Sequence, residues 1–209
     1  QGLRHLADLS SLTILNLSYT PVTDRGLAHL SGLVALEELF LGDTLVTDGG
    51  LSHLALMSNL KGLGLSGTRI QGHGLKHLQR HGSLERIGLS GTLLSDDGVR
   101  YLAELPNLTA VSLRGTAVTD AGVPKLQTLS KLEVLWLDRT KVTARGLTWL
   151  QNLEHIREVG LRNCPVGDDL VEVVSSLKQL AVLNIFGATI SEKAREALKN
   201  ALPDCEIIR

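Results

Sequence analysis

The fold is decided by the stretch Leu12-Thr13-Ile14-Leu15-Asn16-Leu17-Ser18-Tyr19-Thr20-Pro21-Val22, because its pattern returns along the whole chain. The same frame starts again every 24 residues, at Leu36, Leu60, Leu84, Leu108, Leu132, Ile156 and Leu180. Eight frames in register, with no insertion between them, indicate a stack of equivalent units. We therefore predict a repeat architecture in which each unit buries its apolar side chains against its neighbours.

Each unit divides into two halves with different periodicity. Leu15-Asn16-Leu17 alternates apolar and polar residues, which predicts a short strand with its leucines facing inward. The segment 23–33 is predicted to be helical, because Leu27, Leu30 and Leu33 recur along one face. At its start, Thr23 suits the N-cap position and Asp24 complements the helix dipole.

A small residue occupies the same place between the two halves of every unit. The series reads Thr20, Thr44, Thr68, Thr92, Thr116, Thr140, Cys164 and Ala188. We expect these side chains to turn inward and to donate to backbone carbonyls that the end of the strand leaves unpaired. Cys164 is accordingly interpreted as a buried structural thiol. A reactive thiol is the alternative, which the absence of a neighbouring His in the sequence disfavours.

The frame Leu-x-x-Leu-x-Leu-x-x-Thr/Cys, followed by Val-Thr-Asp-x-Gly-Leu, resembles the cysteine-containing, ribonuclease-inhibitor-like branch of the leucine-rich repeats. That branch includes the repeat domains of F-box substrate adaptors. The chain is also similar to bacterial arrays in which Thr fills the ladder position. The resemblance covers essentially the whole chain. It implies an α/β solenoid, a horseshoe with a parallel β-sheet on its concave face and helices on its convex face.

The expected organisation is a single leucine-rich-repeat domain over residues 1–209. Residues 1–11 form a partial N-terminal unit, 12–203 form eight repeats, and 204–209 form a C-terminal cap strand. The segment 2–9 has the pattern of the helical half of an earlier unit. We therefore expect further repeats upstream, and a monomeric fragment of a longer chain.

Composition narrows the class of partner. Lys and Arg together number 21 and Asp and Glu 22, so no bulk charge points to nucleic acid or to an anionic membrane. No apolar run approaches the roughly 18 residues that would span a bilayer. The chain has only two cysteines, and no disulfide-rich cap is visible, which favours a cytoplasmic location over secretion.

Candidate chemistry is sparse. His73, His77 and His81 are spaced so that they could share one helical face and chelate a cation. No carboxylate or Cys completes such a set, so surface histidines are the favoured interpretation. No Ser/His/Asp or Cys/His combination can be assembled either. We therefore predict a protein that is not an enzyme and that has no cofactor and no metal site.

The outward side chains of the strands predict where a partner would bind. They lie two, four, six and seven residues after the frame Leu, and they form columns across the concave face. The middle units place Gly and Ser in these columns, whereas aromatic and charged residues gather at the two ends. The candidate contact residues are Trp136, Arg114, Arg139, Arg162, Asp138 and Phe186 towards the C-terminus, and Phe40, Tyr19, Glu38 and Asp43 towards the N-terminus.

Exposed aromatic residues and Arg are the usual hot spots of interfaces. The sequence therefore predicts a module that binds a protein or peptide, with Trp136 packed on an apolar group and the three arginines paired with acidic groups. A narrower alternative is the substrate-recognition domain of a ubiquitin-ligase adaptor. Another alternative is an architectural array without a defined ligand, on which these residues are merely solvated surface.

Overall fold

The computed structural model describes residues 2–209, and its strands form one parallel nine-stranded sheet in sequence order. The strands are β1 (Ile14–Asn16), β2 (Glu38–Phe40), β3 (Gly62–Gly64), β4 (Arg86–Gly88), β5 (Ala110–Ser112), β6 (Val134–Trp136), β7 (Glu158–Gly160), β8 (Val182–Asn184) and β9 (Glu206–Ile208). Partners are 24 residues apart, so that Ile14 lies beside Glu38 and Phe40 beside Gly64. The predicted solenoid with a parallel sheet is confirmed.

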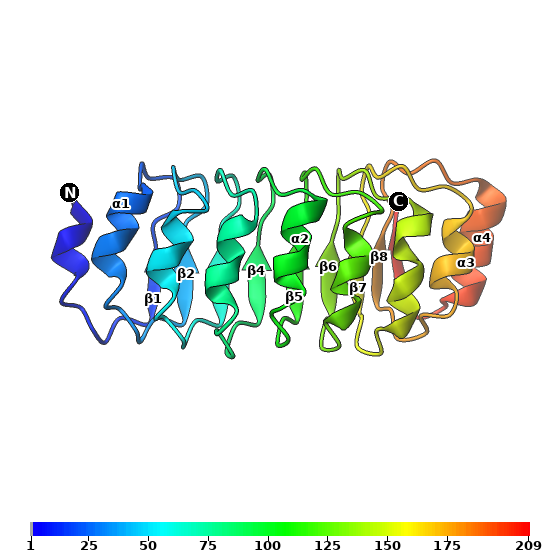
Figure 1. Ribbon diagram of the computed structural model, residues 1–209. Helices are drawn as coiled ribbons and strands as arrows, with labels where there is room; N and C mark the ends of the chain where they lie inside the picture. Colours follow the sequence, from blue (N-terminus) through cyan, green and yellow to red (C-terminus); the bar gives the residue numbers. More distant parts are fainter. Residues whose placement is uncertain (1) are drawn as a thin grey trace.

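The helices lie on the other side of the sheet and follow the same order along the stack (Figure 1). They are η1 (Gly2–Leu6), α1 (Asp24–Leu27), η2 (Ala28–Leu30), η3 (Gly50–Leu54), η4 (His73–Leu78), α2 (Asp96–Leu102), η5 (Val123–Thr128), η6 (Ala144–Asn152), α3 (Leu170–Val174) and α4 (Glu192–Ala201), where η marks a 3₁₀ helix. A 3₁₀ helix rises about 2.0 Å per residue against about 1.5 Å in an α-helix. It therefore crosses the unit with fewer residues, as a short 24-residue repeat requires.

A continuous aliphatic core runs between the sheet and the helices. The strand residues Leu39, Leu63 and Leu135 and the helical residues Leu27 and Leu30 are all buried in it. Since each unit contributes to one cluster that its neighbours complete, the core extends along the stack and has no single centre.

The ladder of small residues behaves as the sequence predicts. Thr44 Oγ1 donates to the Leu41 carbonyl at 2.7 Å, and the ladder threonines of the other units repeat this bond. Cys164 is buried, and its Sγ donates to the Leu137 carbonyl of the preceding unit at 3.0 Å. Burial raises the pKa of the Cys164 thiol, which keeps it protonated and structural.

The Thr-Asp turn links neighbouring units, a role that the sequence analysis did not foresee. Thr23 makes no side-chain capping bond to its own helix. Instead, the Asp24 carboxylate accepts from the backbone N–H of Thr47 at 2.8 Å and from its hydroxyl at 2.6 Å. The same bonds recur between the pairs Asp96 and Thr119, Asp120 and Thr143, and Asp168 and Ser191.

This linkage explains the glycine of the turn. A Cβ on Gly50 would lie 2.4 Å from Asp24 Oδ1, so glycine leaves room there for the carboxylate of the preceding unit. In the seventh unit Leu170 replaces that glycine, and there the preceding unit has Ala144 in place of the Asp. In that pair the larger Leu170 faces a unit that lacks the carboxylate, whereas Asp168 keeps its bonds to Ser191 although Ala194 replaces the glycine there.

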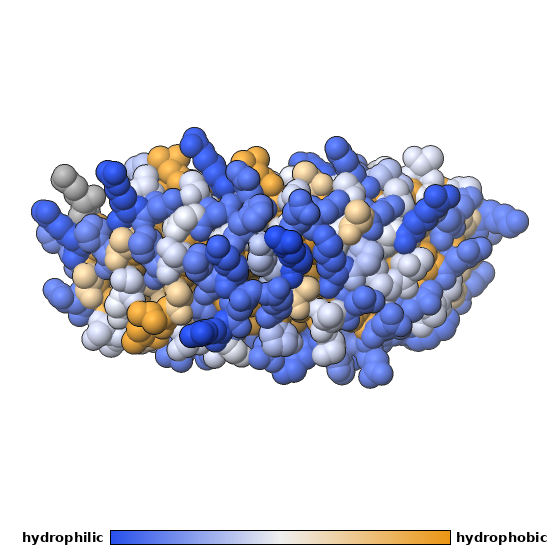
Figure 2. Space-filling view, viewed as in Figure 1, coloured by the Kyte–Doolittle hydropathy of each residue, from blue (hydrophilic) through white to orange (hydrophobic). Residues whose placement is uncertain are grey.

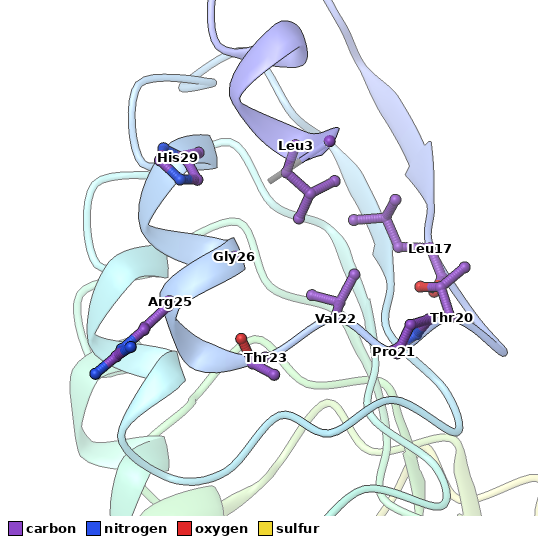
Figure 3. A pocket seen from close by; sticks show the side chains of 10 residues that line it. Leu3, Leu17, Thr20, Pro21, Val22, Thr23, Arg25, Gly26 and His29 are labelled. Atoms are coloured by element: carbon purple, nitrogen blue, oxygen red, sulfur yellow. The ribbon is translucent and has the colours of Figure 1, made fainter.

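The N-terminal end of the stack exposes residues that are buried in the other units. Whereas Leu41 in the second unit is fully buried, its counterpart Leu17, directly after β1, is only partly buried. Beside it lies a groove of about 560 Å³, into which Leu3, Leu17 and Val22 point (Figure 3). At the other end, β9 pairs with β8 and covers the last repeat.

The helix-bearing face is mostly hydrophilic, with small and separate apolar clusters (Figure 2). Within residues 2–209, none of the helices has the length and apolarity that a bilayer crossing would need.

The three spaced histidines do not share a helical face. His73 and His77 lie on η4, which ends at Leu78, whereas His81 follows it. His81 is only 2% exposed, and its ring nitrogens lie 3.1 and 3.0 Å from the carbonyl oxygens of Leu78 and Leu54. The interpretation of His81 as a surface residue is therefore wrong, because its ring is buried against two backbone carbonyls, to one of which the neutral ring can donate. No group of potential metal ligands is found in the described part of the chain.

Candidate functional site: the concave face of the sheet

The strand register places the candidate residues in columns across the concave face. Asn16, Phe40 and Gly64 lie side by side, and Ser112, Trp136 and Gly160 continue the same column further along. Because the register never shifts, the spacing seen in the sequence becomes a spacing of strands on the sheet. The aromatic residues therefore sit at two separate places on one face.

Trp136 on β6 is held by two neighbours. Its Nε1 donates to the Glu158 carboxylate at 2.5 Å, and the Arg114 guanidinium lies 4.3 Å from the centre of its ring. The ring leans over Gly160, where a Cβ would lie 2.9 Å from Trp136 Cδ1. Trp136 is therefore half-buried and fixed, and does not stand free above the sheet.

Asp138, one of the predicted contact residues, supports a neighbouring side chain. It is only 7% exposed. Its carboxylate accepts from Arg114 Nε at 2.5 Å and from the backbone N–H of Arg162 at 2.8 Å. A buried carboxylate with two such donors positions Arg114.

A polar notch of about 300 Å³ lies next to Trp136. It is lined by Arg114, Asp138, Arg139, Arg162 and Asn184. The Arg162 guanidinium lies 4.8 Å from the centre of the Phe186 ring. Thus five of the six residues predicted for the C-terminal end meet around one notch or stack on its edge, and the sixth, Trp136, carries Arg114.

The N-terminal candidates are held more loosely. Tyr19 is 84% exposed and Phe40 is 38% exposed. They line a hollow of about 190 Å³ together with Asp43. Glu38 is engaged in an ion pair with Arg86, which reaches it across Gly62 from two strands away. Arg86 is missing from the sequence-derived candidates, although the column two residues after the frame Leu already places it opposite Glu38.

Between the two aromatic residues lies a trough of about 380 Å³. Its floor is made of Gly62, Gly64, Gly88, Ala110 and Ser112, with Phe40 at one end and Trp136 at the other. The bare centre that the sequence shows is therefore a preformed hollow. Its depth comes from the small size of the floor residues between two large rings.

One column is built on left-handed backbone. The residue seven positions after the frame Leu has a positive φ in every unit, at Tyr19, Asp43, Gly67, Gly91, Gly115, Arg139, Asn163 and Gly187. Glycine adopts this conformation freely, whereas Tyr or Arg is strained there by about 1–2 kcal/mol. The strained residues Tyr19 and Arg139 both belong to the candidate set. The sequence indicates this left-handed position, because four of the eight units have glycine there.

Comparisons with known proteins agree with this geometry. A family model described as "Leucine Rich repeat" matches residues 8–31. The fold is that of a leucine-rich-repeat solenoid. The chain is similar to the crystal structure of internalin C2 from Listeria monocytogenes, at 26% identity and a TM-score of 0.76, over 96% of this chain and 83% of that one.

A leucine-rich-repeat protein of Leptospira interrogans shares the fold at 19% identity and a TM-score of 0.65, over 99% of this chain and 62% of that chain. No curated protein matches the sequence. The leucine-rich-repeat fold is thus confirmed. The ribonuclease-inhibitor-like branch and its F-box adaptors find no counterpart among these matches.

Proposed function

We propose that this leucine-rich-repeat solenoid is a non-catalytic module that binds an extended peptide segment of a protein partner in the trough of its concave face. The observation that carries the proposal is the preformed hollow between Phe40 and Trp136, with its floor of glycine, alanine and serine. Leucine-rich-repeat proteins generally bind other proteins, and this face offers an apolar surface between two aromatic rings, of which Trp136 is held in place. A peptide backbone can approach glycine closely because no Cβ stands in the way.

The dimensions suit a short peptide. Phe40 and Trp136 lie four strands apart, which corresponds to about 19 Å at roughly 4.8 Å per strand. An extended chain covers this distance with about six residues. Because the trough is already formed in the free protein, little ordering of the receptor would oppose binding.

The test uses peptides selected from a random display library on the intact chain, with affinities measured by calorimetry. Gly88→Val is the decisive variant. A Cβ on Gly88 meets nothing closer than 3.4 Å, so the fold tolerates it, while the valine methyl groups fill the trough. We expect the variant to melt as the parent does and to lose at least about tenfold in affinity. Unchanged affinity would contradict the proposal.

Trp136→Ala and Phe40→Ala test the two ends separately. If each ring is a hot spot, its removal weakens binding by about 2 kcal/mol. The matched control is Leu56→Ala, because Leu56 is an exposed apolar residue that does not line the trough. Equal losses in all three variants would show that the concave face has no special role.

The ubiquitin-ligase adaptor is a narrower form of the same proposal and rests on the sequence resemblance alone. It predicts an F-box segment in the parent protein. The architectural array is the rival, and it predicts that no library peptide is selected against the face. A cytoplasmic location also stays a prediction from cysteine usage, which fractionation of cells that express the parent protein would check.

A further inference from the structure

We propose that the notch beside Trp136 binds a phosphate monoester carried by the peptide in the trough. The inference rests on the proposed function, because the notch adjoins the end of the trough. Trp136 closes the trough, and Arg114, which stacks on Trp136, lines the notch. A peptide that passes over Trp136 would bring its next side chain to the arginines.

The notch is lined almost entirely by hydrogen-bond donors. Arg114 uses only Nε for Asp138, so its two terminal nitrogens remain free to donate. The side chains of Arg139 and Arg162 form no hydrogen bond or ion pair within residues 2–209. Asn184 accepts the Phe186 N–H through its Oδ1 at 3.1 Å, which leaves its amide N–H groups as donors. Such a lining matches a ligand that only accepts hydrogen bonds.

Two of the guanidinium groups are held in place before any ligand arrives. Arg114 lies on the Trp136 ring and is bound to the buried Asp138, and Arg162 lies on the Phe186 ring. A planar guanidinium fixed on an aromatic face presents its N–H edge in a defined direction, which favours paired bonds to phosphate oxygens.

The balance of charge points to a dianion. Three arginines and one aspartate line the notch, which leaves an excess of two positive charges. The nearby Glu158 keeps its negative charge when it accepts from the neutral Trp136 Nε1–H, but it does not line the notch. A phosphate monoester carries a charge of about −1.5 to −2 at neutral pH and three acceptor oxygens. A single carboxylate would leave one positive charge unmatched.

The backbone of Arg139 adds an independent observation. Its φ is 57°, at a position where four other units have glycine. An arginine at this place keeps a strained backbone that glycine would relieve, and strain of this kind is concentrated at functional sites. Arg139 therefore carries its long side chain at the notch at a cost in backbone strain that glycine would avoid.

The experiment uses three small probes on the intact chain, phenyl phosphate, phenyl sulfate and benzoate. They share the ring, but only phenyl phosphate is both tetrahedral and doubly charged. Binding is followed by NMR through the Nε–Hε signals of the arginines and by the fluorescence of Trp136. We expect phenyl phosphate to shift the signals of Arg114, Arg139 and Arg162 and to bind about tenfold more tightly than either other probe. Equal binding of the three probes, or no binding, would overturn the inference.

Arg162→Gln should weaken phenyl phosphate binding by about tenfold, because it removes a charged donor. The matched control is Arg86→Gln, on the same face but outside the notch, which should leave binding unchanged. Equal weakening by both variants would indicate general charge attraction and would contradict the site.

The peptide and phenyl phosphate measurements distinguish a failure of the proposed anion site from a failure of the proposed peptide site. Gly88→Val should weaken peptide binding at least about tenfold and leave phenyl phosphate binding intact. In the parent, a phosphorylated peptide should bind about tenfold more tightly than its unphosphorylated form. If phenyl phosphate binds but no peptide does, the proposed function is wrong while the anion notch stands. If peptides bind but phenyl phosphate does not, the notch is wrong while the proposed function stands.

Discussion

The two ends of the concave face carry similar residues but hold them differently. Towards the C-terminus each aromatic ring supports an arginine, Arg114 on Trp136 and Arg162 on Phe186, and a buried Asp138 ties the cluster together. Towards the N-terminus Tyr19 is almost fully exposed. The comparison shows that one repeat frame can build either a preorganised cluster or a loose one, depending on which side chains occupy adjacent units.

The largest difference in stability between the two ends is expected when their aspartates, Asp138 and Asp43, are replaced. Asp138→Asn places an amide against Arg114 Nε and removes the charge that holds it, which should lower the free energy of unfolding by about 2–3 kcal/mol. Asp43→Asn at the other end should change it by less than about 0.5 kcal/mol, because Asp43 is exposed and Asn tolerates positive φ. Urea denaturation of both variants measures the contrast, and equal losses would refute it.

The glycines beneath the rings give the next contrast. In Gly160→Ala the new Cβ would lie 2.9 Å from Trp136 and 3.0 Å from Asp138 Oδ2, both of which are fixed. We expect a loss of about 1–2 kcal/mol from this overpacking.

Gly64→Ala is the matched control for that substitution. Its Cβ would lie 3.0 Å from Phe40 Cδ1, but nothing pins that half-exposed ring, which can swing away. Its melting temperature should therefore stay close to that of the parent. A larger loss here than in Gly160→Ala would mean that the N-terminal end is the more rigid one.

A smaller and stabilising effect is expected at Arg139 and Tyr19, where both ends have a strained residue with positive φ. Arg139→Gly and Tyr19→Gly both relieve a positive φ, and each should raise the free energy of unfolding by about 0.5–1 kcal/mol. Only Arg139→Gly should also weaken phenyl phosphate binding. Thermal melting and the NMR titration separate the two effects, and a stabilised Arg139→Gly variant with full binding would remove Arg139 from the notch.

The smallest expected effect is a pH dependence of stability caused by His81, which lies in the scaffold between the two ends. Burial lowers the pKa of His81 below 6.5, partly offset by its bonds to the Leu54 and Leu78 carbonyls. The unfolded chain then takes up a proton more readily than the folded one. The contribution of His81 to the free energy of unfolding should therefore be fully present above pH 6.5. It should fall as the pH drops from 6.5 towards the lower pKa of His81 in the folded protein. Urea denaturation across this range should show a slope that His81→Asn reduces, and an unchanged slope would exclude His81 as its source.

Much of the fold was predictable because every unit has the same length. A constant 24-residue period gives the parallel sheet, its register, the Thr ladder and the columns of outward residues without further information. The inter-unit bond from Asp24 to Thr47 was not predictable, since the same residues suit an N-cap within one unit. The burial of His81 was missed for a related reason, because one of its carbonyl partners, Leu54, belongs to the preceding unit.

The 24-residue repeat alone therefore specifies the scaffold and the position of each outward side chain on the sheet, because a repeat without insertions converts residue number directly into position. The contacts of those side chains depend on the folded arrangement of neighbouring units. Whether a ring is free or covered depends on the residue one strand away, as Gly160 and Arg114 show for Trp136. Such orientations arise from packing between units, and this packing buries the Asp138 carboxylate against Arg114.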